Sequence, residues 1–90
     1  MNQTNDSNPT WAEDEGVESA VLRQLLELHP TRLTMGELTR EFSSRGGGFA
    51  ERDAVERAVR ELAATGLLHQ GEEFVAPTRA ALRFSELLDQ

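Results

Sequence analysis

The sequence predicts a mainly α-helical domain with one small β-hairpin, an α+β fold in the order helix, strand, helix, helix, hairpin, helix. Four segments carry apolar residues at the three- and four-residue spacing of amphipathic helices. Before the last of them, two short runs of strand-forming residues flank a turn that contains glycine. A chain of 90 residues has room for one such domain, which we expect over residues 17–90.

Residues 1–16 are expected to form a polar, acidic tail. This segment is rich in Asn, Ser and Thr, contains the run Glu13-Asp14-Glu15, and has Trp11 as its one aromatic residue. A segment with so few apolar side chains buries too little surface to offset the entropy cost of ordering, so we expect it to be disordered.

The first helix is expected over residues 17–28, because Val17, Val21 and Leu25 recur on one face. His29-Pro30 ends it, since the residue before a proline avoids the α region. After a short extended link, Thr34 and Glu37 match the capping box S/T-x-x-E, which opens a second helix. The apolar stripe of that helix consists of Met35, Leu38 and Phe42.

A loop over residues 43–48, with three consecutive glycines, leads to a third helix at about residues 51–65. Gly66 follows that helix at the position where a left-handed glycine commonly ends a helix. The expected strands cover residues 67–70 and 73–76, with Gly71-Glu72 as the turn. The predicted buried face of the third helix is Val55, Ala58, Val59 and Leu62.

Pro77-Thr78 is expected to end the hairpin and to cap a fourth helix. Its apolar residues nearly encircle it, which is more than one packed face requires. Part of that surface could bind a second copy of the chain, and the alternative is that all of it packs on its own domain. The candidate residues for a dimer or partner surface are Leu82, Phe84, Leu87 and Leu88.

Three segments resemble the winged helix-turn-helix superfamily, in particular small prokaryotic transcriptional regulators. Residues 33–38 are similar to the entry of the first helix of the motif, and residues 53–68 match V-x-x-A-V-x-x-L-x-x-x-G-L-L, typical of its second helix. Residues 74–84 resemble the second wing strand and the C-terminal helix. The resemblance covers about residues 17–88 and implies binding of double-stranded DNA, with the third helix in the major groove.

The wing and the loop depart from that pattern. Glu72 and Glu73 stand at the expected wing tip, where DNA-binding wings usually carry basic residues, and phosphates would repel them. The loop before the third helix is also longer than the usual turn.

Charge leaves two functions open. The chain has 16 acidic and 9 basic residues, a net charge of −7, and every basic residue is arginine. Residues 1–30 carry six acids and one arginine, residues 31–65 carry six of each, and residues 66–90 carry four acids and two arginines. The middle segment is therefore balanced, which permits DNA binding without a basic surplus. The alternative function is a protein adaptor whose acidic surface binds a basic partner.

Steps of 100° place Asp53, Arg57 and Arg60 opposite the buried face of the third helix. Arginine can bind guanine or phosphate there, and a carboxylate can accept from cytosine. The competing interpretation is a solvated face with the ion pairs Asp53–Arg57 and Glu56–Arg60. The candidate DNA-binding residues are Arg40, Arg45, Arg52, Asp53, Glu56, Arg57 and Arg60.

Other functions find no support in the residues. The chain has no cysteine, and His29 and His69 lie 40 residues apart without a matching carboxylate, so we expect no metal site. The three glycines at 46–48 are not followed by the Gly-Lys-Ser/Thr of a phosphate loop. We expect no catalytic residues, no cofactor, no small-molecule substrate, no membrane association and a cytoplasmic location.

Overall fold

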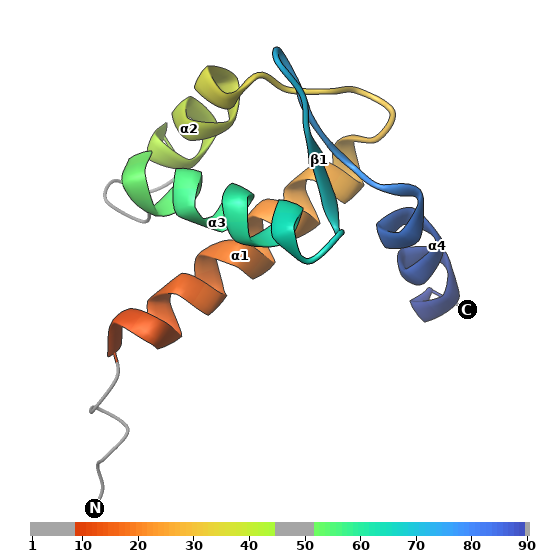
Figure 1. The fold of residues 1–90 in the computed structure, drawn as a ribbon, viewed down its shortest axis with the longest axis horizontal. Coiled ribbons are helices and arrows are strands. Elements are labelled where there is room, and N and C mark those ends of the chain that lie inside the picture. Colours follow the sequence, from red (N-terminus) through yellow and green to blue (C-terminus); the bar gives the residue numbers. More distant parts are fainter. Residues whose placement is uncertain (1–8, 45–51, 90) are drawn as a thin grey trace, which may run out of the picture.

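The computed structural model describes residues 9–44 and 52–89, with side chains for residues 15–42 and 52–89. The elements in chain order are α1 (Pro9–Leu28), α2 (Met35–Ser44), α3 (Arg52–Ala64), β1 (Leu68–Gln70), β2 (Val75–Pro77) and α4 (Arg79–Leu88). The described part is mostly helical with one two-stranded sheet, which confirms the α+β class. In Figure 1, α3 crosses α1, and α2 and α4 lie at opposite ends of the molecule.

Helix α1 begins at Pro9, eight residues before the start expected from the sequence. Residues 9–16 therefore belong to the helix and not to the tail, while residues 1–8 lie outside the described residues. Proline suits the first helical position because its φ is already helical and the N–H it lacks would have no partner there. Gly16 lies inside the helix and does not end it.

The capping box of α2 is confirmed. The Thr34 N–H donates to Glu37 Oε1 at 2.9 Å, and the Glu37 N–H donates to Thr34 Oγ1 at 3.0 Å. These bonds satisfy two backbone donors at the start of the helix. The helix continues through Ser44, two residues into the expected loop, and the rest of that loop, with Arg45, lies outside the described residues.

Gly66 ends α3 as the sequence predicts. Its φ is +87°, the left-handed region that favours glycine. The Leu67 N–H donates to the Leu62 carbonyl at 2.9 Å, and the Gly66 N–H donates to the Ala63 carbonyl at 3.1 Å. This is a Schellman motif, which fixes the direction in which the chain leaves α3 for β1.

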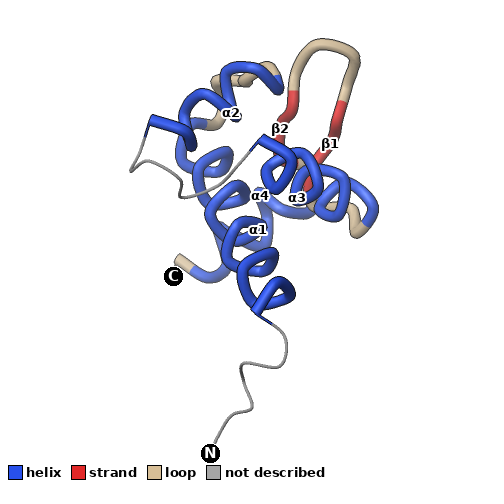
Figure 2. Tube along the Cα trace, turned by 90° about the vertical axis from the view of Figure 1, so that its left-hand side faces the viewer, coloured by secondary structure: helices blue, strands red, loops and turns tan. Residues whose placement is uncertain are grey.

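The hairpin pairs β1 with β2 in antiparallel register, with Leu68 opposite Pro77 and Gln70 opposite Val75. The second strand starts two residues later than predicted, and Pro77 lies inside it instead of ending it. Proline is tolerated at this position at the end of the ladder, because the next bond is made by the Thr78 N–H to the Leu67 carbonyl at 3.0 Å. Figure 2 shows the two strands and their connecting turn projecting beyond the helices.

A third extended segment joins this sheet through Leu33. Leu33 forms an antiparallel bridge with Val75, and the Val75 N–H donates to the Leu33 carbonyl at 2.8 Å. The link between α1 and α2 therefore lies beside β2, which attaches the hairpin to the first half of the chain.

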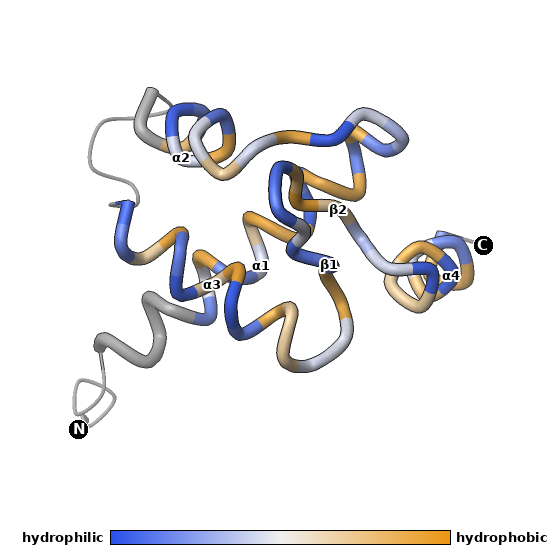
Figure 3. Tube along the Cα trace, turned by 45° about the horizontal axis from the view of Figure 1, so that its top comes forward, coloured by the Kyte–Doolittle hydropathy of each residue, from blue (hydrophilic) through white to orange (hydrophobic). Residues whose placement is uncertain are grey.

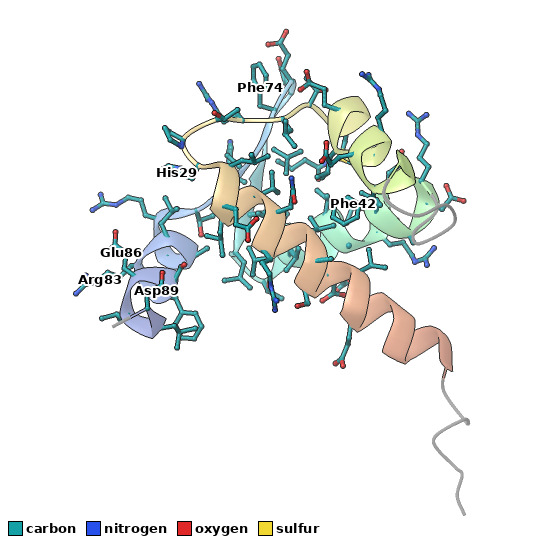
Figure 4. The ribbon with its side chains drawn as sticks, turned by 180° about the vertical axis from the view of Figure 1, so that it is seen from behind. His29, Phe42, Phe74, Arg83, Glu86 and Asp89 are labelled. Atoms are coloured by element: carbon teal, nitrogen blue, oxygen red, sulfur yellow. The ribbon has the colours of Figure 1, made fainter. Side chains whose placement is uncertain are left out.

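The core lies where α1, α2, α3 and the hairpin meet. Phe42 and Leu38 of α2 are fully buried, and Phe42 points between the helices in Figure 4. Figure 3 shows the apolar positions of α1 and α3 alternating with polar ones, as amphipathic helices require. Among the described residues, no helix has the length and apolar character needed to cross a membrane. The largest fully buried side chains are Val21, Leu25, Leu38, Phe42, Val55, Val59 and Val75.

Thr78 caps α4 and attaches it to the turn after α3. Its Oγ1 accepts the Ala81 N–H at 3.2 Å, as the sequence predicts for a cap. The same hydroxyl donates to the Gly66 carbonyl at 2.7 Å, with the Leu67 carbonyl at 3.3 Å. Helix α4 packs on α1 and β2, and only Ala81 of its residues is buried.

Candidate nucleic-acid interface

Helix α3 has two distinct faces. Val55, Ala58, Val59 and Leu62 are buried, which confirms the predicted core face. Arg57 and Arg60 are exposed on the opposite side, together with Asp53 in the first turn. Asp53 is well placed for the helix dipole, which favours negative charge at a helix N-terminus. The outer face therefore presents two arginines whose positions follow from the apolar spacing of the helix.

The ion pair that Glu56 makes on α3 differs from the expected one. Glu56 Oε2 lies 3.1 Å from Arg52 Nε, so Glu56 pairs with Arg52 and not with Arg60. The pair is exposed, with 71% of the Arg52 side chain accessible, and such pairs contribute about 0–1 kcal/mol. The four-residue spacing is the predicted one, but the arginine precedes the acid. The Arg52 guanidinium thus contacts a carboxylate of the same helix, and Arg60 lies beside Arg57 on the outer face.

A hollow of about 460 Å³ lies between α3 and the N-terminal half of α1. Both arginines of the outer face line it, with Glu61 of α3 and with Glu15 and Glu18 of α1. The two acids of α1 were not among the predicted site residues: Glu15 lay in the expected tail, and nothing in the spacing of the sequence indicates that Glu18 lies beside α3. A predicted helix that begins at Pro9 would contain both Glu15 and Glu18, which lie three residues apart and therefore on the same side of the helix.

Arg40 lies elsewhere. It is exposed on α2 and lines a shallow hollow of about 320 Å³ with Leu33, Glu37 and Glu41. That hollow shares no residue with the hollow beside α3. The structure therefore brings Arg57 and Arg60 together and places Arg40 in a separate acidic setting.

The turn of the hairpin is acidic, as the sequence indicates. Glu72 and Glu73 are exposed in it, and the turn is closed by a bond from the Gly71 N–H to the Phe74 carbonyl at 2.9 Å. Arg32 lies over the ring of Phe74, with its guanidinium carbon 5.4 Å from the ring centroid. This is within the range of a cation–π contact, so Arg32 and Phe74 tie the link after α1 to the hairpin (Figure 4).

The described residues include no group of three or more His, Asp or Glu side chains placed to hold a metal ion. His29 and His69 are exposed, one after α1 and the other in β1. On α4, the side chains of Phe84, Leu87 and Leu88 are exposed, whereas Leu82 is half-buried. The predicted partner surface therefore consists of three exposed apolar side chains instead of four.

Comparison of the chain with models of protein families, with curated proteins and with solved structures finds no match.

Proposed function

We propose that this protein is a winged helix-turn-helix DNA-binding protein of the transcription-regulator class, with α3 as the helix that enters the major groove. The order of elements supports this, because α2 and α3 pack together and a hairpin follows α3 directly. The extended residue Leu33 beside β2 supports it further, as it supplies a third extended segment at the base of the wing.

The observation that carries the proposal is the outer face of α3. An α-helix with its side chains is about 10–12 Å in diameter and the major groove is about 12 Å wide, so the 13-residue α3 can enter the groove. Arg57 and Arg60 would contact base edges or phosphates from that face. The acids of the hollow and of the wing tip oppose further phosphate contacts, so we expect about two or three phosphates to be neutralised, with weak binding and a modest salt dependence.

Fluorescence anisotropy of a mixed-sequence duplex tests the proposal. Neutralising two or three phosphates gives a slope of about −2 to −3 in log affinity against log salt, because each contributes about −0.9. The affinity should fall about 10- to 60-fold between about 50 and 200 mM salt. Absence of binding at the lower salt concentration would refute DNA binding.

A pair of variants tests the role of α3. Replacing Arg57 and Arg60 by alanine should flatten the slope by nearly two, while Arg83→Ala removes an exposed arginine from α4 and should change nothing. Circular dichroism checks that the variants retain their helices. Equal affinity of the double variant and of Arg83→Ala would exclude α3 as the DNA-contacting element.

The acidic residues favour a second candidate function, a winged-helix adaptor that binds a basic protein. Glu15 and Glu18 line the hollow beside α3, and Glu72 and Glu73 occupy the wing tip. A Lys/Arg-rich peptide is the probe for this function. Binding that survives Arg57→Ala and is lost on replacing both wing glutamates by glutamine would support the adaptor. Failure of such a peptide to bind would reject it.

A further inference from the structure

The hollow beside α3 contains acids as well as the two arginines that we propose to bind DNA. Three carboxylates and two guanidinium groups line it, which gives it one net negative charge. A carboxylate and a phosphate are both oxyanions that a guanidinium group binds through the same N–H donors. The acids therefore compete with DNA for the arginines. The charged residues of the hollow are Glu15 and Glu18 of α1 with Arg57, Arg60 and Glu61 of α3.

The two acids of α1 are held in place in different ways. Glu18 is half-buried and lies in the chain between Val17 and Val21, which are both buried, so the core fixes its turn of the helix. Glu15 is exposed and precedes Val17, the first buried residue among the described side chains of α1. The position of Glu15 in the hollow therefore depends on the helix continuing through Gly16.

Gly16 weakens the helix at the point where it leaves the core. An interior glycine favours the unwound chain about four- to fivefold relative to alanine. An added Cβ would meet nothing within 4 Å there, so packing does not account for the glycine. Figure 1 shows the N-terminal turns of α1 extending beyond the other helices. These turns can therefore unwind while the core, which begins at Val17, stays intact.

We infer that residues 9–16 of α1 form an autoinhibitory segment for DNA binding. While they are helical, the Glu15 carboxylate stays in the hollow and opposes phosphate, and when they unwind at Gly16 it leaves the arginines to DNA. This inference rests on the proposed DNA binding by α3 and adds its regulation. The apparent affinity is that of the open form multiplied by the fraction of chains in that form, so a change that favours the helix at Gly16 weakens binding.

Removing the Glu15 carboxylate tests the competition. In the anisotropy titration at about 50 mM salt, Glu15→Gln should tighten DNA binding about threefold, the effect in water of one unit charge about 7 Å from a phosphate. Glu27→Gln is the matched control, because Glu27 is an exposed glutamate of the same helix that does not line the hollow. It should change the affinity by less than about 1.5-fold. Equal effects of the two variants would mean that only the net charge matters and would overturn the inference.

Substitutions at Gly16 test the unwinding without a change in charge. Gly16→Ala should weaken DNA binding about two- to fivefold, because it favours the helical form. Gly16→Pro breaks the helix at that point and should tighten binding at least as much as Glu15→Gln does. In the Glu15→Gln background, Gly16→Ala should lose most of its effect, a coupling that a general change in stability would not produce.

The two ways in which this inference can fail are distinguished by the wild-type chain. Far-ultraviolet circular dichroism checks that each variant keeps the helices of the core. If the wild type binds the duplex and the two substitutions at Gly16 leave the affinity unchanged or shift it in the same direction, the autoinhibition is overturned and DNA binding stands. If the wild type, Glu15→Gln and Gly16→Pro all fail to bind, the proposed DNA binding is refuted, and the inference with it.

Discussion

Replacing Thr78 by valine tests how α4 is attached to the rest of the domain. Valine keeps the branched shape but has no hydroxyl, so the Ala81 N–H and the Gly66 carbonyl both lose a partner. Loss of an N-cap costs about 1 kcal/mol. The Gly66 carbonyl belongs to an exposed residue and can bond to water, so its loss costs about 0.5 kcal/mol. We expect the free energy of unfolding to fall by about 1.5 kcal/mol and Tm to fall by about 6–12 °C.

Urea unfolding followed by far-ultraviolet circular dichroism measures this loss. Thr78→Ser is the matched control, because serine keeps the hydroxyl and caps helices as well as threonine does, so its unfolding free energy should lie within about 0.5 kcal/mol of the wild type. Trypsin gives a second readout, since it cleaves after Arg79 and Arg83 once α4 detaches. If valine and serine at position 78 gave the same stability and the same rate of cleavage, the described role of this hydroxyl would be wrong.

Three further predictions concern two glycines, one core residue and the hairpin turn. Gly66→Ala should lower the free energy of unfolding by about 1–2 kcal/mol, whereas Gly16→Ala should raise it by about 0.4–1 kcal/mol. An added Cβ meets nothing within 4 Å at either position, so only the φ of +87° at Gly66 separates them, and equal signs in urea titrations would contradict this. Phe42→Ala should cost about 3–5 kcal/mol in thermal unfolding, and a loss below about 1 kcal/mol would mean that α2 packs differently. Replacing Glu72 and Glu73 by lysine should steepen the salt dependence of DNA binding by up to about two units of slope, and an unchanged slope would place the wing away from phosphates.

Local signals account for most of the elements. The capping box at Thr34, the glycine at position 66 and the apolar spacing of α3 each depend on neighbours within a few residues, so the sequence predicts them correctly. The predicted start of α1 is wrong because the polar and acidic composition of residues 1–16 favours a disordered tail, whereas residues 9–16 are helical. Pro9, a favourable first helical residue, carried the opposite signal.

The surroundings of the candidate site depend on packing between distant segments. The exposure of Arg57 and Arg60 follows from the 100° step of a helix. Their proximity to Glu15 and Glu18 requires the packing of α1 on α3, which brings together residues about 40 positions apart and leaves no local signal in the sequence. The pairing of Glu56 with Arg52 was missed because two arginines lie four residues from it, and local spacing does not choose between them.

The bridge between Leu33 and Val75 determines which parts of the protein unfold together. Its two residues are separated by 75 − 33 = 42 positions, and the chain between them forms α2, α3 and β1. Closing so long a loop costs entropy that only the assembled core repays, so this contact belongs to the late part of folding. The Val75 amide is buried and bonded across that closure, and its hydrogen should exchange with solvent only through global unfolding. The hairpin therefore shares one cooperative transition with the three helices of the core, while α4 can open without them.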